Sequence, residues 1–348
     1  MAGTDGLNLT IRIAHSINEI DRKMWDDLSA GKPFQSHRWY QFGERVMDDC
    51  EPVYLLAFHN DELVGRAALW VIHNEPLPLG PGIWRSLFQP IMRRRPLLIC
   101  RSPLSNAAGL VLPPPPLRAE TLSALGQAAL SVARRRLCLV LVFDFLDDAE
   151  SRNWPPGFSP IKVSNPGTLM QNRWNSFDEY LAGRNKKDRQ HYKRTLREAQ
   201  KLNIQLERCS SVPDVAAALE LINNVDRRYG NPPNPWMRRL LENIGMVDGT
   251  WLDARQNGEL VGGGALFEDN GAQLTTALGL ADNAPYVYLL LTYASLEEAF
   301  KRKVELLRWG SGAYDVKEQL GFQVDVNDFI VISSGNFFLK KLSQWLAG

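Results

Sequence analysis

The sequence predicts an α/β (α+β) fold of two related domains, each a mixed, mainly antiparallel sheet flanked by helices. Three observations support this prediction. The 348 residues are enough for about two domains at ~150 residues each. A fourteen-residue pattern recurs 197 positions further along the chain. In the second half, segments of antiparallel strand type are followed by a strand–helix–strand order. We place the domains at residues 1–165 and 166–348.

The repeat is the most informative of these observations. Residues 57–70 read AFHNDELVGRAALW and residues 254–267 read ARQNGELVGGGALF, with identity at eight of fourteen positions. The same shift places Trp39 on Trp236. Each copy has the signature of a β-hairpin, in which two apolar strands flank the tight turn Asn60-Asp61 or Asn257-Gly258. A period of 197 residues is too long for a solenoid and therefore indicates tandem domains.

The remaining elements follow from apolar periodicity. In the first half we expect helices at 20–28, 37–47 and 117–136, a buried strand at 138–145, and an irregular proline-rich stretch that ends at Pro116. In the second half we expect helices at 177–202, 212–229, 236–244, 286–302 and 314–320. The expected strands there are 204–209, 250–255, 260–268, 272–280, 305–309 and 323–332.

The composition narrows the classes of function. Lys plus Arg number 40 and Asp plus Glu 39, a balance unlike that of a protein that coats nucleic acid. No apolar segment approaches the ~20 residues of a membrane helix, and the N-terminus lacks a secretory pattern, so we expect a cytoplasmic protein. Four cysteines form no CxxC pair and five histidines show no metal spacing, so we expect no metal. The P-loop, HExxH and GxSxG motifs are absent.

The order of the elements and three sequence stretches carry a resemblance to a known family. Strand–turn–strand–strand, helix, strand and helix with a final Gly-Phe resembles the GNAT acyltransferase fold. The runs IDRKMWDDLSAGKPFQSHRWYQFGERV and SFDEYLAGRNKKDRQHYKRTLREAQKLNIQLE resemble Fem-related transferases, which contain two GNAT domains. The run WGSGAYDVKEQLGF is similar to that family's glycine turn, tyrosine, lysine and Gly-Phe. The resemblance spans nearly the whole chain.

The resemblance implies an amide-forming acyltransferase. In GNAT enzymes two neighbouring strands splay apart, the pantetheine arm of a thioester lies in the gap, and the freed N–H groups bind the acyl oxygen as charge develops. By position, the splayed pair here is 272–280 and 305–309. The usual acetyl-CoA loop contains Arg/Gln-x-x-Gly-x-Gly/Ala, whereas LADNAPYVYLL has no glycine pair. The anion nest for the CoA pyrophosphate is therefore missing.

Several donors and acceptors are compatible with this family. We expect an acyl-CoA or an acyl carrier protein as donor, and an amine of a small molecule, amino sugar or peptide as acceptor. The first alternative is a transferase of the Fem type, whose donor is an aminoacyl-tRNA. A second alternative is a non-catalytic binding protein with a decayed GNAT site.

The candidate catalytic residues cluster near the C-terminal motif. Lys317, beside a turn that contains Gly310 and Gly312, can neutralise a developing oxyanion or hold a phosphate of the donor. In many GNAT enzymes the tyrosine that protonates the leaving thiolate stands at the position of Lys317, and Tyr314 lies almost one helical turn earlier. The alternative interpretations are a solvated helix lysine, an aromatic residue that packs, and a purely conformational glycine turn.

Two carboxylates are candidates for the general base that deprotonates the amine. Glu268 lies at the end of a hairpin strand, where a base can reach the cleft, although a charged strand end is the default interpretation. Asp226, within the sequence NNVDRRYGNP, lies near the end of a helix that can face the acceptor.

A basic run is the candidate donor-binding surface. Residues 184–201 contain eight Lys and Arg against two carboxylates, a net charge of +6. Lys186, Lys193 and Arg197 fall on one helical face. Such a stripe attracts a phosphorylated donor, namely the acceptor stem of a tRNA, the phosphates of CoA or the acidic helix of a carrier protein. The alternative is an ordinary solvated face.

Overall fold

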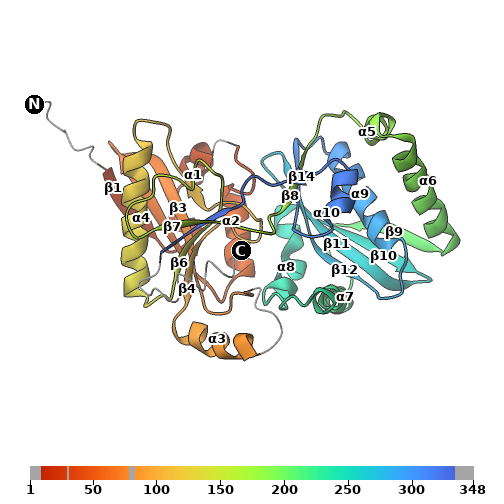
Figure 1. Cartoon of the computed structure of the whole chain (residues 1–348), viewed down its shortest axis with the longest axis horizontal. Helices are drawn as coiled ribbons and strands as arrows, with labels where there is room; N and C mark the ends of the chain where they lie inside the picture. Colours follow the sequence, from red (N-terminus) through yellow and green to blue (C-terminus); the bar gives the residue numbers. More distant parts are fainter. Residues whose placement is uncertain (1–8, 30, 78–82, 334–348) are drawn as a thin grey trace, which may run out of the picture. The chain divides into compact units, whose positions relative to one another are not determined.

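The chain folds into two compact units, each built on one sheet (Figure 1). The structure is a computed structural model that describes residues 9–29, 31–77 and 83–333. Unit 1 comprises the chain up to Pro166 together with the part from Val326 onward, and unit 2 comprises Gly167–Asp325. No helix in the described ranges is long and apolar enough to cross a membrane.

The sheet of unit 1 has the strand order β1-β2-β3-β4-β6-β15-β7, with the short β5 paired to β3. Its strands are β1 (Leu9–Ala14), β2 (Glu51–His59), β3 (Glu62–Ile72), β4 (Leu97–Cys100), β5 (Leu110–Val111), β6 (Leu141–Leu146), β7 (Ser159–Lys162) and β15 (Phe329–Ser333). Its helices are η1 (Ile17–Glu19), α1 (Arg22–Ser29), α2 (His37–Val46), α3 (Ile83–Arg94) and α4 (Arg118–Arg135).

The two faces of this sheet are buried in different ways. On one face, the apolar side of α4 packs on the strands through Leu122, Leu125 and Ala129. On the other face lies an aromatic cluster from the strands and the N-terminal helices, in which Trp25 meets Tyr40 and Tyr54 edge to face. Because both faces are covered, unit 1 has a buried core on each side of its sheet.

The sheet of unit 2 has the order β14-β8-β13-β12-β11-β10-β9. Its strands are β8 (Thr168–Gln171), β9 (Ile204–Cys209), β10 (Thr250–Gln256), β11 (Glu259–Asp269), β12 (Ala272–Leu280), β13 (Leu306–Trp309) and β14 (Gln323–Val324). Its helices are α5 (Phe177–Gly183), α6 (Lys186–Lys201), α7 (Val215–Tyr229), α8 (Met237–Asn243), η2 (Ile244–Val247), α9 (Val287–Lys301) and α10 (Tyr314–Gln319).

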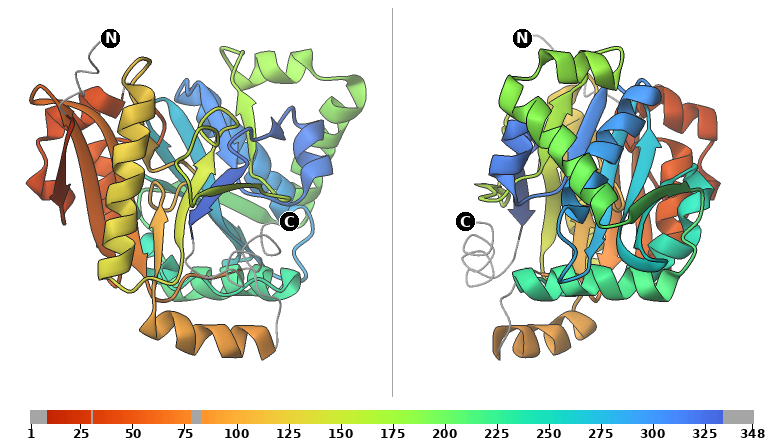
Figure 2. Two further views of the ribbon diagram at one scale, coloured as in Figure 1. Left: turned by 60° about the vertical axis from the view of Figure 1, so that its left-hand side comes forward. Right: turned by 90° about the vertical axis from the view of Figure 1, so that its right-hand side faces the viewer.

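Helices α7 and α9 cover opposite faces of this sheet. On the α9 face, Leu290 packs with Leu278 and Leu280 of β12. Gly279 points to the other face because side chains alternate along a strand, and there a Cβ atom would lie 2.9 Å from the backbone nitrogen of Ile222 in α7. Helices α5 and α6 meet at an angle (Figure 2), and α6 lies along α9, where Nδ1 of His191 is 3.0 Å from the Tyr293 hydroxyl.

The predicted duplication is confirmed by the order of elements. Apart from the 3-10 helices and the additional α3 and β5 of unit 1, unit 1 runs β1-α1-α2-β2-β3-β4-α4-β6 and unit 2 runs β9-α7-α8-β10-β11-β12-α9-β13. In both units four antiparallel strands precede a helix that connects two parallel strands. Both predicted hairpin turns have positive φ at their two central residues, 49° and 63° at Asn60-Asp61 and 53° and 89° at Asn257-Gly258. This geometry is that of a type I′ turn.

Three sequence expectations differ from the structure. The expected helix at 177–202 is two helices, because the Asn185 side chain caps α6 and ends α5 at Gly183. The proline-rich stretch before Pro116 is not wholly irregular, since it contains α3, β4 and β5. The expected strand at 323–332 is divided: β14 pairs with β8 in unit 2, whereas β15 pairs with β6 and β7 in unit 1. Unit 2 therefore ends at Asp325 rather than at residue 348.

Candidate functional site

The central feature of unit 2 is an opening between β12 and β13. The two strands pair in parallel only from Ala272–Leu306 to Thr275–Trp309, and β13 then ends. Strand β12 continues to Leu280 and stays paired with β11 on its other edge. In the described part of the chain, no strand pairs with residues 276–280 on the β13 side. Alternate backbone groups of this segment are therefore available to a ligand.

The turn at which β13 leaves the sheet holds a lysine side chain. Gly312 has a φ of 83° and Ala313 a φ of 46°, so the chain reverses through left-handed backbone before α10 begins at Tyr314. The predicted glycine turn at Gly310 and Gly312 is therefore present. For Ala313, which has a Cβ atom, this conformation costs roughly 1–2 kcal/mol. The turn and α10 hold Lys317 so that its Nζ donates to the Gly310 carbonyl at 2.6 Å and lies 3.3 Å from the Ser311 carbonyl.

Lys317 is a buried cation that has no counter-ion among the residues described by the structure. Only 7% of the residue is exposed, and burial lowers the pKa of its ammonium group to about 8. Among the described residues, no carboxylate lies within ion-pair distance of its Nζ. The ring of Tyr314 lies 5.9 Å from Nζ. An ammonium group held by two carbonyl oxygens and offered no carboxylate is poised to receive a negative charge from a ligand.

A pocket of about 400 Å³ opens beside the lysine. It lies on the β8 side of β13, whereas the opening lies on the β12 side. Its lining residues are Thr168, Tyr314, Lys317, Glu318, Gly321, Phe322, Gln323 and Val324. Lys317 is thus one of the walls of a hollow large enough for part of a small molecule, and it touches the turn at which β13 leaves the sheet.

Two residues at this place were missed by sequence reasoning. The indole Nε1 of Trp309 is buried and has no acceptor among the described residues, and its ring stacks on Phe322 with centroids 4.1 Å apart. The Thr168 hydroxyl lies 3.4 Å from the Gly310 carbonyl. Trp309 directly precedes the glycine turn, and that position is a signal that could have indicated it. Thr168 lies 142 residues earlier in the chain than Gly310, and no sequence pattern links the two.

Asp226 lies at the open end of β12. It stands one helical turn beyond Ile222 of α7, which covers Gly279. Two residues further along, Arg228 forms an ion pair of 2.7 Å with Asp282, which follows β12 directly. Burial raises the pKa of Asp226, and a hydrogen bond from Asn231 opposes that shift. The carboxylate thus belongs to the α7 face of the sheet, at the end where β12 has lost its partner.

Glu268, predicted as a base at the cleft, lies at the other end of β12 from this opening. It pairs in register with Gln273, next to the β11–β12 turn, whereas the opening begins beyond Thr275. Its carboxylate lies 3.6 Å from the Arg302 guanidinium, at the far end of α9. The sequence identified a strand end correctly, but only the register tells which end of the strand faces the opening.

The loop before α9 lacks the glycine-rich turn that commonly holds a nucleotide pyrophosphate. The helix follows Tyr286, whose φ is 68°, and no side chain caps its first N–H groups. Pro285 has no N–H group to offer, and Asp282 contributes a carboxylate to the same loop. Phosphate sites at helix N-termini rely on several backbone N–H groups in a glycine-rich turn. The free edge of β12 does fit a chain of amide groups such as pantetheine.

The predicted donor-binding cations lie elsewhere in unit 2. Lys186, Lys193 and Arg197 are exposed on α6, the helix that packs along α9. They do not line the pocket beside Lys317. The structure therefore separates the predicted site into two parts, a buried lysine beside an open strand edge and an exposed basic helix.

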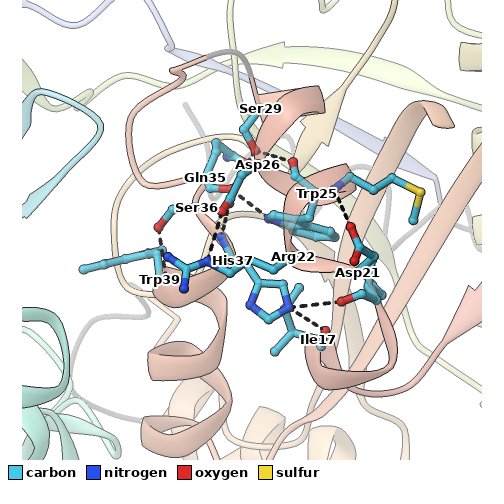
Figure 3. Close-up of polar contacts among 12 residues, drawn as sticks. Ile17, Asp21, Arg22, Trp25, Asp26, Ser29, Gln35, Ser36, His37 and Trp39 are labelled. Carbon is cyan, nitrogen blue, oxygen red and sulfur yellow. Dashed lines mark hydrogen bonds and ion pairs between the residues drawn. The ribbon is translucent and has the colours of Figure 1, made fainter.

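Within the described residues, no group of three His, Cys, Asp or Glu side chains could hold a metal ion. His37 of unit 1 illustrates the structural use of histidine in this chain (Figure 3). Its Nε2 lies 2.9 Å from the Ile17 carbonyl and 3.3 Å from the Ile20 carbonyl, in the buried interior. The Asp26 side chain accepts from the backbone N–H of the same residue at 2.7 Å.

Comparison with solved structures agrees with this architecture. FemX matches with a TM-score of 0.61 and 10% identity, over 96% of this chain and 100% of that chain. A tandem GNAT protein from the clavulanic acid biosynthesis pathway matches with a TM-score of 0.56 and 14% identity, over 94% and 99%. The C-terminal domain of a putative lysylphosphatidylglycerol synthetase from Agrobacterium fabrum matches with a TM-score of 0.53 and 10% identity, over 95% and 96%.

No protein-family model and no curated protein matches the sequence. At identities of 10–14% the likeness to the solved structures concerns the fold. The chain is a tandem GNAT-fold protein with the two-domain architecture of Fem-like proteins, as its sequence predicted.

Proposed function

We propose that this chain is an N-acyltransferase whose unit 2 moves an acyl group from a thioester donor to an amine. Two observations in unit 2 carry the proposal together: β12 has an unpaired edge beyond the end of β13, and the turn that follows β13 holds a buried ammonium group with no carboxylate partner among the described residues. The likeness to tandem GNAT structures supports the same activity.

The free edge of β12 would receive the donor. Backbone N–H and C=O groups of residues 276–280 can bond to the amide groups of a pantetheine arm as a further strand would. The acyl carbonyl then lies where strand β13 ends. There, N–H groups of the edge and the Lys317 ammonium stabilise the oxygen as it takes up negative charge.

The reaction itself needs one base and one proton donor. The amine nitrogen attacks the thioester carbon, the carbonyl electrons move to oxygen, and collapse of this intermediate breaks the carbon–sulfur bond. Asp226 is the base that accepts the proton lost by the amine, directly or through water, and its raised pKa suits that role. The departing thiolate takes a proton from the Tyr314 hydroxyl or from water. Holding both substrates together supplies the rest of the rate advantage.

A second candidate is an aminoacyltransferase that takes its acyl group from a charged tRNA. The exposed basic face of α6 favours this candidate, because phosphates of an acceptor stem would bind there. The likeness to FemX is a likeness of fold and is compatible with either donor.

The deciding experiment is a transfer assay with the purified full chain. We expect release of free thiol from acyl-CoA or acyl-pantetheine that depends on both protein and an added amine, measured over a panel of amino acids, amino sugars and lysine peptides. Transfer only from charged tRNA would establish the second candidate. Ligand-dependent thermal stabilisation with no turnover from any donor would indicate a binding protein with a decayed site.

A further inference from the structure

Helix α6 presents a strip of positive charge on its outward face. Tyr192, Thr195 and Ala199 point toward the body of unit 2, and Thr195 and Ala199 are fully buried. At 100° per residue, the positions opposite them form the outward stripe of the helix. We call this set, with its two flanking cations, the α6 basic strip: Lys186, Lys187, Gln190, Lys193, Arg194, Arg197 and Lys201.

Most of this charge is not neutralised within the protein. Glu198 pairs with Arg197 and Lys201 at 3.2 Å, and Asp188 is engaged with Arg184 at 3.1 Å. Four exposed cations of the α6 basic strip form no ion pair with any described residue. They are Lys186, Lys187, Lys193 and Arg194.

The placement of two of these lysines works against the helix itself. Lys186 and Lys187 occupy the first two positions of α6, directly after the Asn185 cap. The helix macrodipole is positive at this end and disfavours cations there. An anionic partner at this end would gain from both lysines and from the helix terminus. The two lysines thus destabilise the start of α6, and a negatively charged partner would offset this destabilisation.

The strip begins next to the proposed active site. Arg184, two residues before α6, donates from its guanidinium to the Gln319 carbonyl at the end of α10. The Tyr180 hydroxyl of α5 donates to the Leu320 carbonyl at 3.0 Å. Gly321, the next residue, lines the pocket that contains Lys317. From this point α6 runs for 16 residues, or about 24 Å, along the outside of α9 (Figure 1).

We propose that the α6 basic strip is the docking surface for an acidic carrier protein that delivers its acyl group on a pantetheine arm. This inference rests on the proposed function and names its donor class. The geometry is consistent with such a donor, because an open strand edge can accept the arm while the loop before α9 lacks the glycine-rich turn of a pyrophosphate site. The negative charge of the carrier instead binds to the α6 basic strip, which starts beside the pocket.

Three features favour a protein over an RNA partner. The strip contains no aromatic side chain on which the unpaired end of an RNA could stack. Leu196, 39% exposed, lies beside Lys193 and Arg197 on α6, and an apolar residue rimmed by charges is typical of protein interfaces. The chain as a whole has a net charge of only +1.

The test is direct binding of a purified acyl carrier protein in its phosphopantetheine form, with the acyl group attached by a non-transferable amide. Titration calorimetry on the full chain requires no turnover. We expect binding to weaken as salt is raised, and the triple variant K186E/K193E/R194E to raise Kd by about tenfold or more. The variant R134E/R135E changes two exposed arginines at the end of α4 and serves as the control, with Kd unchanged. Thermal unfolding of each variant verifies that the fold is retained, and K186Q/K193Q/R194Q gives a milder version of the same change.

Three results would overturn the inference. It fails if the carrier protein does not bind, if both triple variants bind it as the unaltered chain does, or if total tRNA binds more tightly than the carrier and loses that binding in the triple variants. None of these results touches the proposed chemistry, which is measured separately by transfer from acyl-pantetheine, a donor with no macromolecular carrier.

Discussion

The two units share the same order of elements, but the parallel strand pair ends differently in each unit. In unit 2, β12 runs five residues beyond its last partner in β13 and leaves an edge free. In unit 1, β4 pairs with β6 only from Leu98–Leu141 to Cys100–Phe143, and the chain then turns back onto β3. There the Ala68 N–H donates to the Gly109 carbonyl, and the Arg101 N–H donates to the Ala68 carbonyl.

Two buried tryptophans donate hydrogen bonds to this loop of unit 1. Trp39 donates from its indole to the Pro103 carbonyl at 2.8 Å, and Trp70 donates to the Arg101 carbonyl at 3.1 Å. A Cβ atom at Gly109 would lie 2.6 Å from the Arg101 nitrogen, so the backbones are in close contact. Unit 1 thus ends β4 early and pairs β3 with the returning chain, whereas unit 2 continues β12 along β11 beyond the end of β13. The comparison teaches that the two units differ in whether the strand beside the parallel pair keeps a free edge.

The interiors of the units also differ at equivalent positions of the repeat. Arg66 in β3 is fully buried over the Trp25 ring at 3.4 Å, and burial lowers its pKa to about 10. The equivalent position in β11 is Gly263, where a Cβ atom would lie 2.1 Å from the Trp251 ring. One unit fills this space with a hydrogen-bonded arginine and the other with an indole, so the same backbone supports two unrelated cores.

The largest expected effect is on the stability of unit 1. Arg66→Ala removes the guanidinium that bonds to the Trp25 and Gln35 carbonyls and to the Ser29 hydroxyl, and it leaves a cavity. We expect the free energy of unfolding to fall by about 3–5 kcal/mol, measured by denaturant titration. Arg12→Ala, on the exposed face, should change it by less than about 0.5 kcal/mol. Normal stability together with lost transfer activity in Arg66→Ala would assign catalysis to unit 1 and break the comparison.

Next in size is the effect of Lys317→Met on transfer. An apolar side chain of similar length keeps the packing of α10 but removes the ammonium group. We expect kcat to fall by about 10²–10³-fold with a smaller change in KM, because the charge acts on the oxyanion formed during the reaction. Lys301→Met, on the exposed end of α9, is the matched control and should retain full activity. A Lys317 variant that turns over normally would leave the lysine with a structural role in the turn.

The packing of α7 on the open strand gives a smaller effect. Gly279→Ala places a Cβ atom 2.9 Å from the α7 backbone, so the helix must shift. We expect a loss of about 1–3 kcal/mol in stability, measured by thermal unfolding, and weaker binding of the donor arm. Gly264→Ala in the neighbouring strand meets its nearest atom at 3.7 Å and should be tolerated. Equal behaviour of the two variants would show that α7 does not hold the free edge of β12.

The pH dependence sharpens the assignment of Lys317. Its folded-state pKa of about 8 lies below the 10.5 of a free lysine, so the unfolded chain binds more protons between these pH values. From this group, the free energy of unfolding rises as pH increases from 8 to 10.5, and this contribution is lost as pH falls through 8. Transfer requires the ammonium form, so kcat should fall by about tenfold per pH unit above the pKa.

The control for this prediction is the pH profile of Lys317→Met, which should lack both alkaline effects. On the acid side, protonation of Asp226 should lower kcat at a pH above that expected for an ordinary aspartate, because burial raises its pKa. An alkaline limb that persists unchanged in Lys317→Met would assign that titration to another group.

Features encoded by neighbouring residues could be predicted from the sequence, whereas features that depend on distant residues could not. The hairpin turns, the glycine turn and Lys317 were predicted because each is encoded in a few adjacent residues with a definite backbone preference. Strand β4 was missed because it is only four residues long and follows a proline-containing helix. The break at Arg184 was missed because a single Asn cap interrupts an otherwise continuous helical pattern.

By itself, the sequence determined that the chain is a duplication, that each half contains a hairpin followed by a helix and a further strand, and that a lysine follows a glycine turn. Tertiary structure decided which end of β12 is free, that Glu268 lies at the other end, and that β15 completes the sheet of unit 1. The physical reason is that turns, caps and periodicity arise from neighbours in sequence. Register and burial arise from pairing between strands that lie many residues apart, and only these long-range contacts create the open edge of β12 and the burial of Lys317.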